Sequence, residues 1–157
     1  MACYCGMVIL GQSGGRRTLS YVPGPVNGPI EGDTSETILG ASLASTQTLV
    51  VRRDALDRID GFDPDLPALV DWDLMIRLAP LGPIGCVDDP LVLQSFSDNS
   101  ITRSPEKRAL ARERIVEKNR DRFASRPDLL ARHYRSAAGE WRRLGRHEKG
   151  RAALARA

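Results

Sequence analysis

The sequence predicts an α/β fold that is followed by an α-helical tail. Of the 157 residues, 41% are hydrophobic and 27% are charged, which is close to the average composition of a soluble globular domain. Up to residue 102, strand-like segments are interleaved with helical patterns, whereas from Ser104 onward the apolar residues recur only at helical spacing. We therefore expect one domain at 1–102 and a helical tail at 103–157.

The elements of the first domain follow from local patterns. Alternating or β-branched apolar residues indicate strands, apolar residues three or four apart indicate helices, and segments rich in proline and glycine indicate loops. The expected elements are a strand at 1–11, a turn at 12–15, a long surface loop at 16–33, a short helix at 35–43, a buried strand at 46–51, an amphipathic helix at 52–59, a loop at 61–67, a helix at 71–79, and short strands at 86–87 and 91–96. The first strand would place Cys3, Cys5, Met7 and Ile9 on one side.

The tail begins with strong helix signals. Ser104 is a suitable N-cap and Pro105 fits the first helical position, so we expect a helix that ends near Phe123. A second helix should begin at Pro127 and end at Gly145, and a short third helix should follow at 147–157. The second helix carries one apolar stripe, made of Leu130, Tyr134, Ala137, Trp141 and Leu144.

The last two helices resemble a tetratricopeptide-like helical hairpin. The positions that carry this resemblance hold bulky, small or turn residues: Tyr134, Ala137, Ala138, Trp141, Gly145, Gly150, Leu154 and Ala157. Arrays of this repeat need about three units to bury their faces, so we expect the hairpin to dock on the preceding domain or on a protein partner. We expect His133 and His147 on its surface.

Charge is distributed unevenly along the chain. Residues 1–100 carry 6 Arg and 13 Asp or Glu, whereas residues 101–157 carry 17 Lys or Arg and 7 acidic residues. A basic tail can bind nucleic acid or an anionic membrane surface. No aromatic cluster or known nucleic-acid motif accompanies these basic residues, so we expect a solvated helical face and no nucleic-acid partner. Peripheral contact with a membrane stays open.

The N-terminus and the cysteines exclude several protein classes. No basic segment precedes the apolar start, and no apolar run is long enough to cross a bilayer. We therefore expect a cytoplasmic protein, with membrane association as the alternative. Cys3, Cys5 and Cys86 are too few for a disulfide framework or a complete tetrahedral metal site, so we expect reduced cysteines and no metal ligands. Neither a Walker-type phosphate loop nor a hydrolase nucleophile elbow occurs.

Four segments between residues 46 and 102 occur in an informative order. They are Thr46-Gln47-Thr48-Leu49-Val50-Val51-Arg52-Arg53, Ile59-Asp60-Gly61-Phe62-Asp63, Val70-Asp71-Trp72-Asp73-Leu74 with Arg77, and Val87-Asp88-Asp89-Pro90. This order is similar to the acceptor-side half of family 2 glycosyltransferases, which have the GT-A fold. The resemblance covers roughly residues 1–102. It implies a partial, Rossmann-like mixed sheet with flanking helices.

The resemblance implies transfer of a sugar from a nucleotide diphosphate sugar to an acceptor hydroxyl. A base must remove the hydroxyl proton as the oxygen attacks the anomeric carbon, an effect typically worth about 100 to 10,000-fold in rate. Asp71 matches the second acidic residue of the family's paired-acid element, so it is the expected catalytic base, and Val70 stands at the first position. The alternative is that Asp71 and Asp73 only complement the helix dipole, while Arg77 pairs with Asp73.

Further residues receive binding roles from the same resemblance. Gln47, Asp63 and Trp72 are expected to bind the acceptor, and Arg52 and Arg53 to approach the diphosphate. Asp63 could instead cap a turn, and the two arginines could equally form a solvated face.

The segment Gly61-Phe62-Asp63 is similar to the family's Gly-Gly-Phe-Asp turn, with Asp60 at the first glycine. We expect Phe62 to anchor this turn in the core.

The chain also departs from the family. The resemblance implies a donor-binding half, in which an Asp-x-Asp element holds Mg or Mn. Both the donor-binding half and this element are absent from the sequence. Two segments have the Asp-x-Asp spacing, Asp63-Pro64-Asp65 and Asp71-Trp72-Asp73, but they lie downstream of the usual position. Ser97 stands where many relatives have a histidine before a segment like Ser100-Ile101-Thr102. We therefore expect an incomplete glycosyltransferase, or alternatively a non-catalytic interaction module derived from one.

Overall fold

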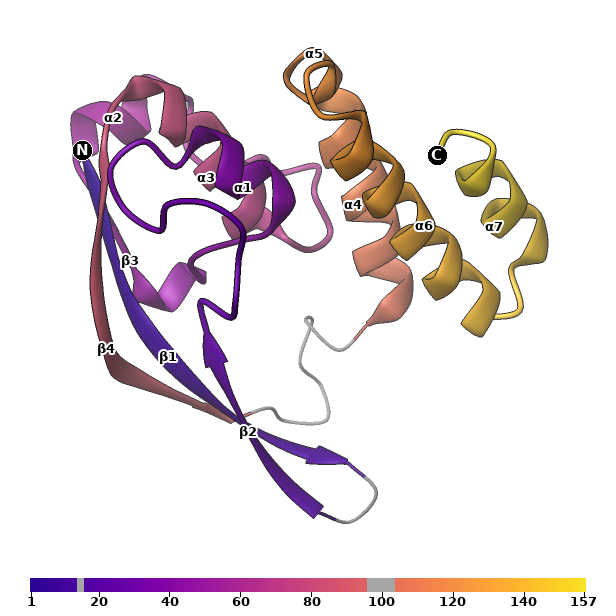
Figure 1. The fold of residues 1–157 in the computed structure, drawn as a ribbon, viewed down its shortest axis with the longest axis horizontal. Coiled ribbons are helices and arrows are strands. Elements are labelled where there is room, and N and C mark those ends of the chain that lie inside the picture. The colour runs from indigo at the N-terminus through magenta and orange to yellow at the C-terminus, as the bar shows by residue number, and fades with distance from the viewer. Residues whose placement is uncertain (14–15, 96–103) are drawn as a thin grey trace. The chain divides into compact units, whose positions relative to one another are not determined.

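The computed structural model describes residues 1–13, 16–95 and 104–157 and shows a mixed α/β chain (Figure 1). It divides into two compact units. The α/β unit comprises Met1–Asp63 and Val70–Ser97, and the helical unit comprises Pro64–Leu69 and Asp98–Ala157. The expected features at Phe96, Ser97 and Ser100-Ile101-Thr102 lie outside the described residues.

The α/β unit is built on a four-stranded mixed sheet whose central strand is β1 (Ala2–Ser13). β1 pairs in antiparallel fashion with β2 (Arg16–Val22) and β3 (Leu49–Val51), and in parallel with β4 (Ile84–Ser95). The register with β4 shifts on both sides of Gly6.

This irregularity interrupts the alternation of β1. Its large buried side chains are Tyr4 and Met7, which are three residues apart. Of the four residues expected on one side of the strand, only Met7 is fully buried, while Cys3, Cys5 and Ile9 are half-buried. The expected single face is therefore wrong, because a simple alternation does not allow for the shift at Gly6.

Residues 16–22 form β2, so the expected loop over 16–33 is wrong in its first part. The run from Arg16 to Val22 pairs residue by residue with β1, for example Leu19 with Leu10. The prolines and glycines that indicated a loop begin only at Pro23, after the strand has ended. Thr18, Leu19 and Tyr21 are of types that favour strands, and pairing with β1 decides the structure.

Two other strand expectations also need correction. Residues 46–48 form the 3₁₀ turn η1 (Thr46–Thr48), because the Thr48 hydroxyl accepts the Ser45 N–H at 3.0 Å and donates to the Ser45 carbonyl at 2.9 Å. Only 49–51 remain as β3, and Val50 is exposed rather than buried. The two short strands expected near Pro90 form the single irregular strand β4.

Helices pack on the sheet and supply most of the core of the α/β unit. They are α1 (Ser35–Gly40), α2 (Arg53–Asp57), α3 (Val70–Leu78) and the 3₁₀ turn η2 (Ala79–Leu81). α1 and α2 are shorter than predicted. On α3, Leu74 and Leu78 are buried as predicted, together with Met75 and Ile76.

Apolar residues also remain exposed on the sheet. Leu10 and Leu19 are cross-strand partners, and Leu93 pairs with Val8 on the other side of β1. With Leu91 they form a leucine patch (Leu10, Leu19, Leu91 and Leu93), whose side chains are 38–71% exposed. This sheet therefore presents apolar surface to solvent in the α/β unit.

The helical unit contains α4 (Pro105–Lys118), α5 (Arg120–Phe123), α6 (Pro127–Arg143) and α7 (His147–Leu154). The Ser104 hydroxyl accepts the Lys107 N–H at 3.4 Å, as expected of an N-cap. The single helix predicted up to Phe123 is interrupted at Asn119. Its side-chain amide donates to the Ile115 carbonyl at 2.8 Å and thereby caps the end of α4.

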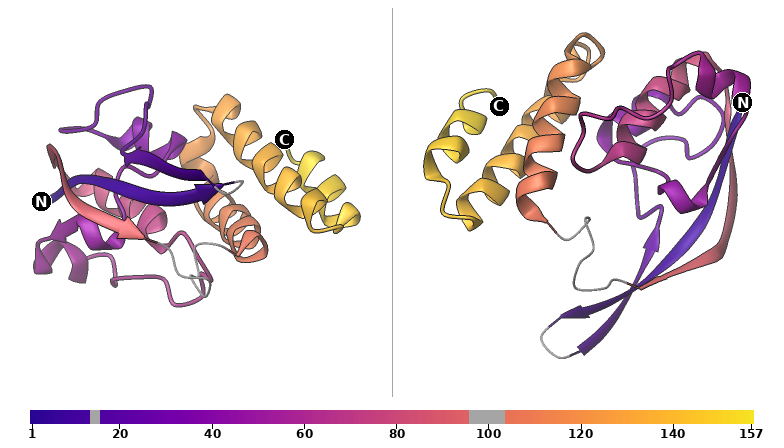
Figure 2. Two further views of the ribbon diagram at one scale, coloured as in Figure 1. Left: turned by 90° about the horizontal axis from the view of Figure 1, so that it is seen from below. Right: turned by 180° about the vertical axis from the view of Figure 1, so that it is seen from behind.

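α6 packs against α4 and α7 (Figure 2). Ala109, Ala138, Trp141 and Ala153 form a core shared by the three helices. α6 ends at Arg143, and Gly145 provides the predicted stop, because this residue has a φ of 72° and the Arg146 N–H donates to the Trp141 carbonyl at 2.9 Å.

Two residues of α6 and its end differ from the sequence-based expectation. Leu144 is 38% exposed and lies outside the buried stripe. His133 is only 4% exposed, packs edge-on against Phe123 with the ring centroids 5.7 Å apart, and has Nδ1 3.1 Å from an Arg112 nitrogen. The expectation of a surface histidine is wrong because α4 and α5 cover this side of α6.

Within the described residues, no helix is both long and apolar enough to cross a membrane.

Candidate functional site

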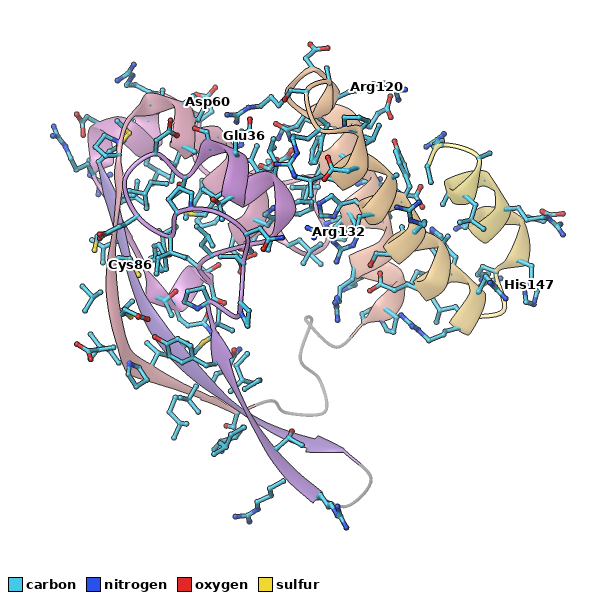
Figure 3. The ribbon with its side chains drawn as sticks, in the orientation of Figure 1. Glu36, Asp60, Cys86, Arg120, Arg132 and His147 are labelled. Carbon is cyan, nitrogen blue, oxygen red and sulfur yellow. The ribbon has the colours of Figure 1, made fainter. Side chains whose placement is uncertain are left out.

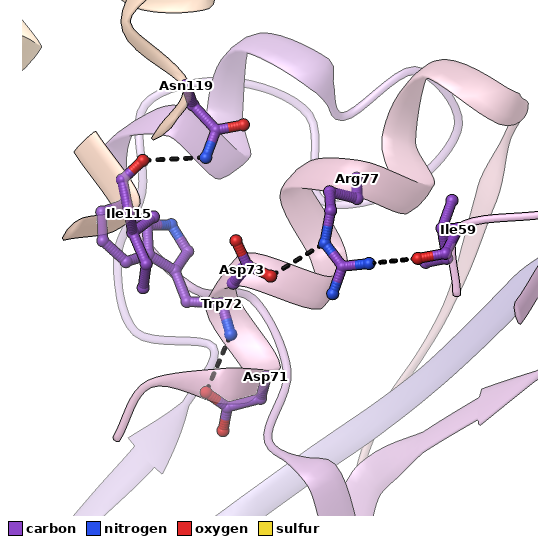
Figure 4. A network of polar contacts seen from close by, with 7 residues as sticks. All are labelled: Ile59, Asp71, Trp72, Asp73, Arg77, Ile115 and Asn119. Atoms are coloured by element: carbon purple, nitrogen blue, oxygen red, sulfur yellow. Dashed lines mark hydrogen bonds and ion pairs between the residues drawn. The ribbon is translucent and has the colours of Figure 1, made fainter. Parts of the chain in front are cut away.

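Asp71 lies in the first turn of α3, where its carboxylate is half-buried. Its Oδ1 accepts the backbone N–H of Trp72 at 2.8 Å (Figure 4). The backbone amide of Thr46, at the start of η1, also interacts with this carboxylate. Two neutral amides from different segments therefore hold Asp71 in place.

Burial raises the pKa of Asp71 above the ordinary value for an aspartate, because removing the carboxylate from water disfavours its charged form. The amides of Trp72 and Thr46 oppose this shift, but burial is the larger effect. A carboxylate with an increased proton affinity is a better proton acceptor near neutral pH than an ordinary one. The direction of the pKa shift of Asp71 is therefore the one that favours proton acceptance.

Asp73 has a different environment, although it is only two residues away. It is 0% exposed, and its Oδ2 is 2.8 Å from Nε of Arg77. Arg77 also donates from Nη1 to the Ile59 carbonyl at 2.6 Å (Figure 4). The expected pairing of Asp73 with Arg77 is confirmed, and it ties α3 to the segment that follows α2.

Trp72 is part of the core. It is 2% exposed, and its indole N–H donates to the Ile38 carbonyl of α1 at 2.7 Å. Such a side chain has almost no surface left for an acceptor, so the structure corrects the expected binding role. The helical periodicity explains the difference, because Trp72 is rotated by about 100° from Asp71 around α3.

Gln47 is exposed on η1, rather than on the strand expected at 46–51. Its Nε2 lies 3.3 Å from the Met7 sulfur. It directly follows Thr46, whose amide interacts with Asp71, so the structure brings Gln47 and Asp71 to neighbouring positions. Thr48 is buried and satisfied within the turn, whereas Thr46 and Gln47 are the exposed side chains of η1.

Arg52 and Arg53 lie at the other end of β3. The three residues of β3 separate them from η1 by about 10 Å at the usual rise of an extended strand. Arg52 forms two hydrogen bonds with the exposed Asp54, at 3.0 and 2.8 Å, and Arg53 is exposed on α2. The structure does not bring these arginines to Asp71, and it favours the solvated-face interpretation.

The turn after α2 is formed by Asp60 and Gly61. Asp60 has a φ of 55°, the Asp60 N–H donates to Asp57, and the Gly61 N–H donates to Leu56 at 3.0 Å. This is a Schellman end of a helix, in which a glycine usually takes the left-handed position.

Phe62, which follows this turn, is 43% exposed, so the expected anchoring in the core is wrong. Asp63 is half-buried beside it.

The structure also shows two features that the sequence did not indicate. Leu69, two residues before Asp71 in the chain, has a φ of 57°, which is unfavourable for a bulky residue. A cavity of about 550 Å³ lies beside Tyr21, whose hydroxyl donates to Asp88 at 2.8 Å; this bond raises the pKa of Tyr21 to about 12. The expectation of a loop at 16–33 did not place Tyr21 near Asp88. The two residues come together only because β2 pairs with β1.

Metal ligands do not gather in the described part of the chain. No group of three His, Cys, Asp or Glu side chains there could hold a metal ion. The described residues therefore do not fit the Mg or Mn that the family resemblance implies.

Comparisons of the chain with protein-family models, with curated proteins and with solved structures gave no match. The residues and their geometry therefore carry the functional interpretation.

Proposed function

We propose that the α/β unit is the acceptor-side portion of a family 2 glycosyltransferase of the GT-A fold, with Asp71 as the catalytic base. The observation that carries this proposal is the half-buried carboxylate of Asp71, which has a raised pKa and is held by neutral amides. The substrate classes are a nucleotide diphosphate sugar and an acceptor with a free hydroxyl.

In the proposed reaction, the acceptor oxygen forms a bond to the anomeric carbon from the side opposite the nucleotide. The bond between that carbon and the diphosphate oxygen breaks, and the electron pair leaves with the diphosphate. The hydroxyl proton passes to the Asp71 carboxylate as the new bond forms. Gln47, which is exposed next to Thr46, can hydrogen-bond the acceptor. The proposal includes no step through Mg or Mn.

The surroundings of Asp71 support this role. Trp72 and the Asp73–Arg77 pair fix α3 against α1 and against the end of α2, so the carboxylate is presented by a rigid element. A fixed scaffold of this kind is what a catalytic group needs, because small displacements reduce the rate strongly.

The turn at Asp60 also supports the resemblance. Its left-handed conformation occurs where the family's Gly-Gly-Phe-Asp turn has its first glycine. The backbone conformation therefore agrees with the motif, even though the residue type differs.

A transfer assay tests the proposal. The purified chain is incubated with radiolabelled UDP- and GDP-hexoses and hydroxyl acceptors, and the labelled product is measured. Whatever transfer rate the chain supports without a donor-binding half should fall by about 100-fold or more in Asp71→Asn, because an amide cannot accept the proton. Asp54→Asn is the matched control, since Asp54 pairs with Arg52 on the surface. Full activity of Asp71→Asn would contradict the base assignment.

The second candidate function is a non-catalytic interaction module derived from a glycosyltransferase. It is favoured by the separate helical unit, whose surface is strongly basic. Calorimetry with UDP- and GDP-sugars in the presence of Mn distinguishes the two. Tight binding of the donor would reject the interaction module.

A further inference from the structure

One side of α6 and the turn that follows it carry five exposed arginines, which we call the arginine stripe: Arg132, Arg135, Arg142, Arg143 and Arg146. At 3.6 residues per turn, the four positions on α6 fall within an arc of about 100° around the helix axis, and Arg146 follows the left-handed turn at Gly145. Figure 3 labels Arg132, which begins the stripe on α6.

The opposite side of α6 is buried in its own unit. Tyr134, Ala137, Ala138 and Trp141 are at most 2% exposed. α4 and α7 contact α6, and a Cβ at Gly150 of α7 would lie 3.1 Å from Cγ of Arg142. The packing of the helical unit therefore fixes the direction in which the stripe faces.

The composition of the stripe is unfavourable for an isolated helix. Arg132 and Arg135 are three residues apart, and Arg142 and Arg143 are adjacent, so like charges lie close together on α6. Between these two pairs the exposed side of the helix has only Ser136 and Gly139. An anionic partner would remove the repulsion that this pattern creates.

Several basic residues of the helical unit are close to acids. Arg120 is 3.3 Å from Glu117, Arg126 is 2.9 Å from Asp128, and Arg108 is 3.6 Å from Glu140. Residues 104–157 nevertheless contain sixteen Lys or Arg and only seven acidic side chains. The excess positive charge is therefore large.

We propose that the arginine stripe docks the protein on an anionic phospholipid membrane surface. From Arg132 to Arg143 the stripe is about 17 Å long at the helical rise of 1.5 Å per residue, so it can meet several lipid headgroups. Clustered basic residues on one helical side bind anionic lipids through their summed charge. The proposal is independent of the proposed sugar transfer.

A membrane fits the described residues better than a nucleic acid. A surface that reads bases or stacks on them usually has exposed aromatic or amide side chains between its basic residues. No exposed aromatic or amide side chain stands between the arginines of the stripe.

Vesicle flotation with the full chain tests the proposal. We expect binding to vesicles made of phosphatidylcholine and phosphatidylglycerol in equal parts, little binding to phosphatidylcholine alone, and release as the salt concentration approaches about 1 M. The variant Arg135→Gln, Arg143→Gln, Arg146→Gln should bind about 100-fold more weakly, at about five-fold for each arginine. The Arg→Lys version should retain most of the binding, because a membrane surface recognises charge rather than guanidinium geometry.

The matched control is Lys107→Gln, Arg120→Gln, Arg151→Gln, which removes the same charge from exposed positions of α4, α5 and α7. It should bind nearly as well as the unchanged chain. Circular dichroism checks that every variant is folded. The proposal is overturned by equal binding to both vesicle types, by equal losses in the two triple variants, or by binding to an RNA duplex or a polyglutamate peptide in place of the vesicles.

Discussion

Asp71 of the α/β unit has different partners from the acidic side chains that pack in the helical unit. In the helical unit, Glu113 accepts the Trp141 indole N–H at 2.6 Å, Glu117 accepts the Tyr134 hydroxyl at 2.9 Å, and Glu140 lies 3.6 Å from Arg108. In the α/β unit, Asp73 likewise has Arg77, whereas Asp71 is half-buried and held by neutral backbone amides.

This difference is the reason why we propose Asp71 as the functional carboxylate. Acids with a cation or a strong side-chain donor are stabilised as anions and contribute to structure. Asp71 keeps a raised pKa, which costs stability when the group is charged at neutral pH. Functional sites are where proteins commonly violate the rules that otherwise stabilise the fold.

The largest expected effect comes from breaking the Asp73–Arg77 pair. Asp73→Ala should lower the free energy of unfolding by about 3–5 kcal/mol, because it leaves the Arg77 guanidinium without its carboxylate in a largely buried position. Urea unfolding followed by circular dichroism measures this loss. A change below about 1 kcal/mol would show that the pair is no more important than a surface ion pair.

Substitution of the two tryptophans should change the free energy of unfolding by a smaller amount. Trp141→Phe removes a hydrogen bond to a carboxylate, and should cost about 1.5–3 kcal/mol, whereas Trp72→Phe removes one to a neutral carbonyl and should cost about 0.5–1.5 kcal/mol. Urea unfolding of both variants gives the two losses. A larger loss of unfolding free energy for Trp72→Phe than for Trp141→Phe would contradict the inference that the hydrogen bond to the carboxylate is the stronger of the two.

A smaller gain is expected at the turn after α2. Asp60→Gly should raise the free energy of unfolding by about 0.5–1 kcal/mol, because glycine adopts the positive φ without steric cost. Asp60→Ala should not, since alanine keeps the Cβ. Thermal unfolding of the two variants checks this, and equal shifts would show that the turn conformation is not limiting.

The smallest expected effect concerns the pH dependence at Asp71. Because its folded pKa is raised, the native state binds more protons than the unfolded state between the ordinary aspartate pKa and the raised value, so stability falls as pH rises through this window. Asp71→Asn should therefore raise the melting temperature at neutral pH, and the gain should vanish below the ordinary pKa. A decrease in melting temperature at neutral pH would mean that the charged carboxylate stabilises the fold.

The sequence predicted features that depend on nearby residues. Ser104, Gly145 and the 2.8 Å pair of Asp73 with Arg77 all act within one or two helical turns, and each occurs as expected. β2 was missed because its stability comes from pairing with β1, and the prolines after it dominated the local composition.

Burial was also set by distant parts of the chain. The exposure of Phe62 and the burial of His133 depend on which elements pack beside them, and residue type alone gave the opposite expectation. At the candidate site, the sequence indicated Asp71 and Gln47, but their common neighbour Thr46 and the core position of Trp72 required the structure.

The pKa of Asp71 itself provides the most direct test. Carbon-13 NMR titration of the aspartate carboxyl groups measures it in the folded chain, with Asp54 as an internal reference whose pKa is lowered by its hydrogen bonds to Arg52. We predict that Asp71 titrates above the ordinary aspartate value of 3.8 and Asp54 below it. An Asp71 carboxyl that titrates at or below 3.8 would contradict its assignment as a carboxylate prepared by burial to accept a proton.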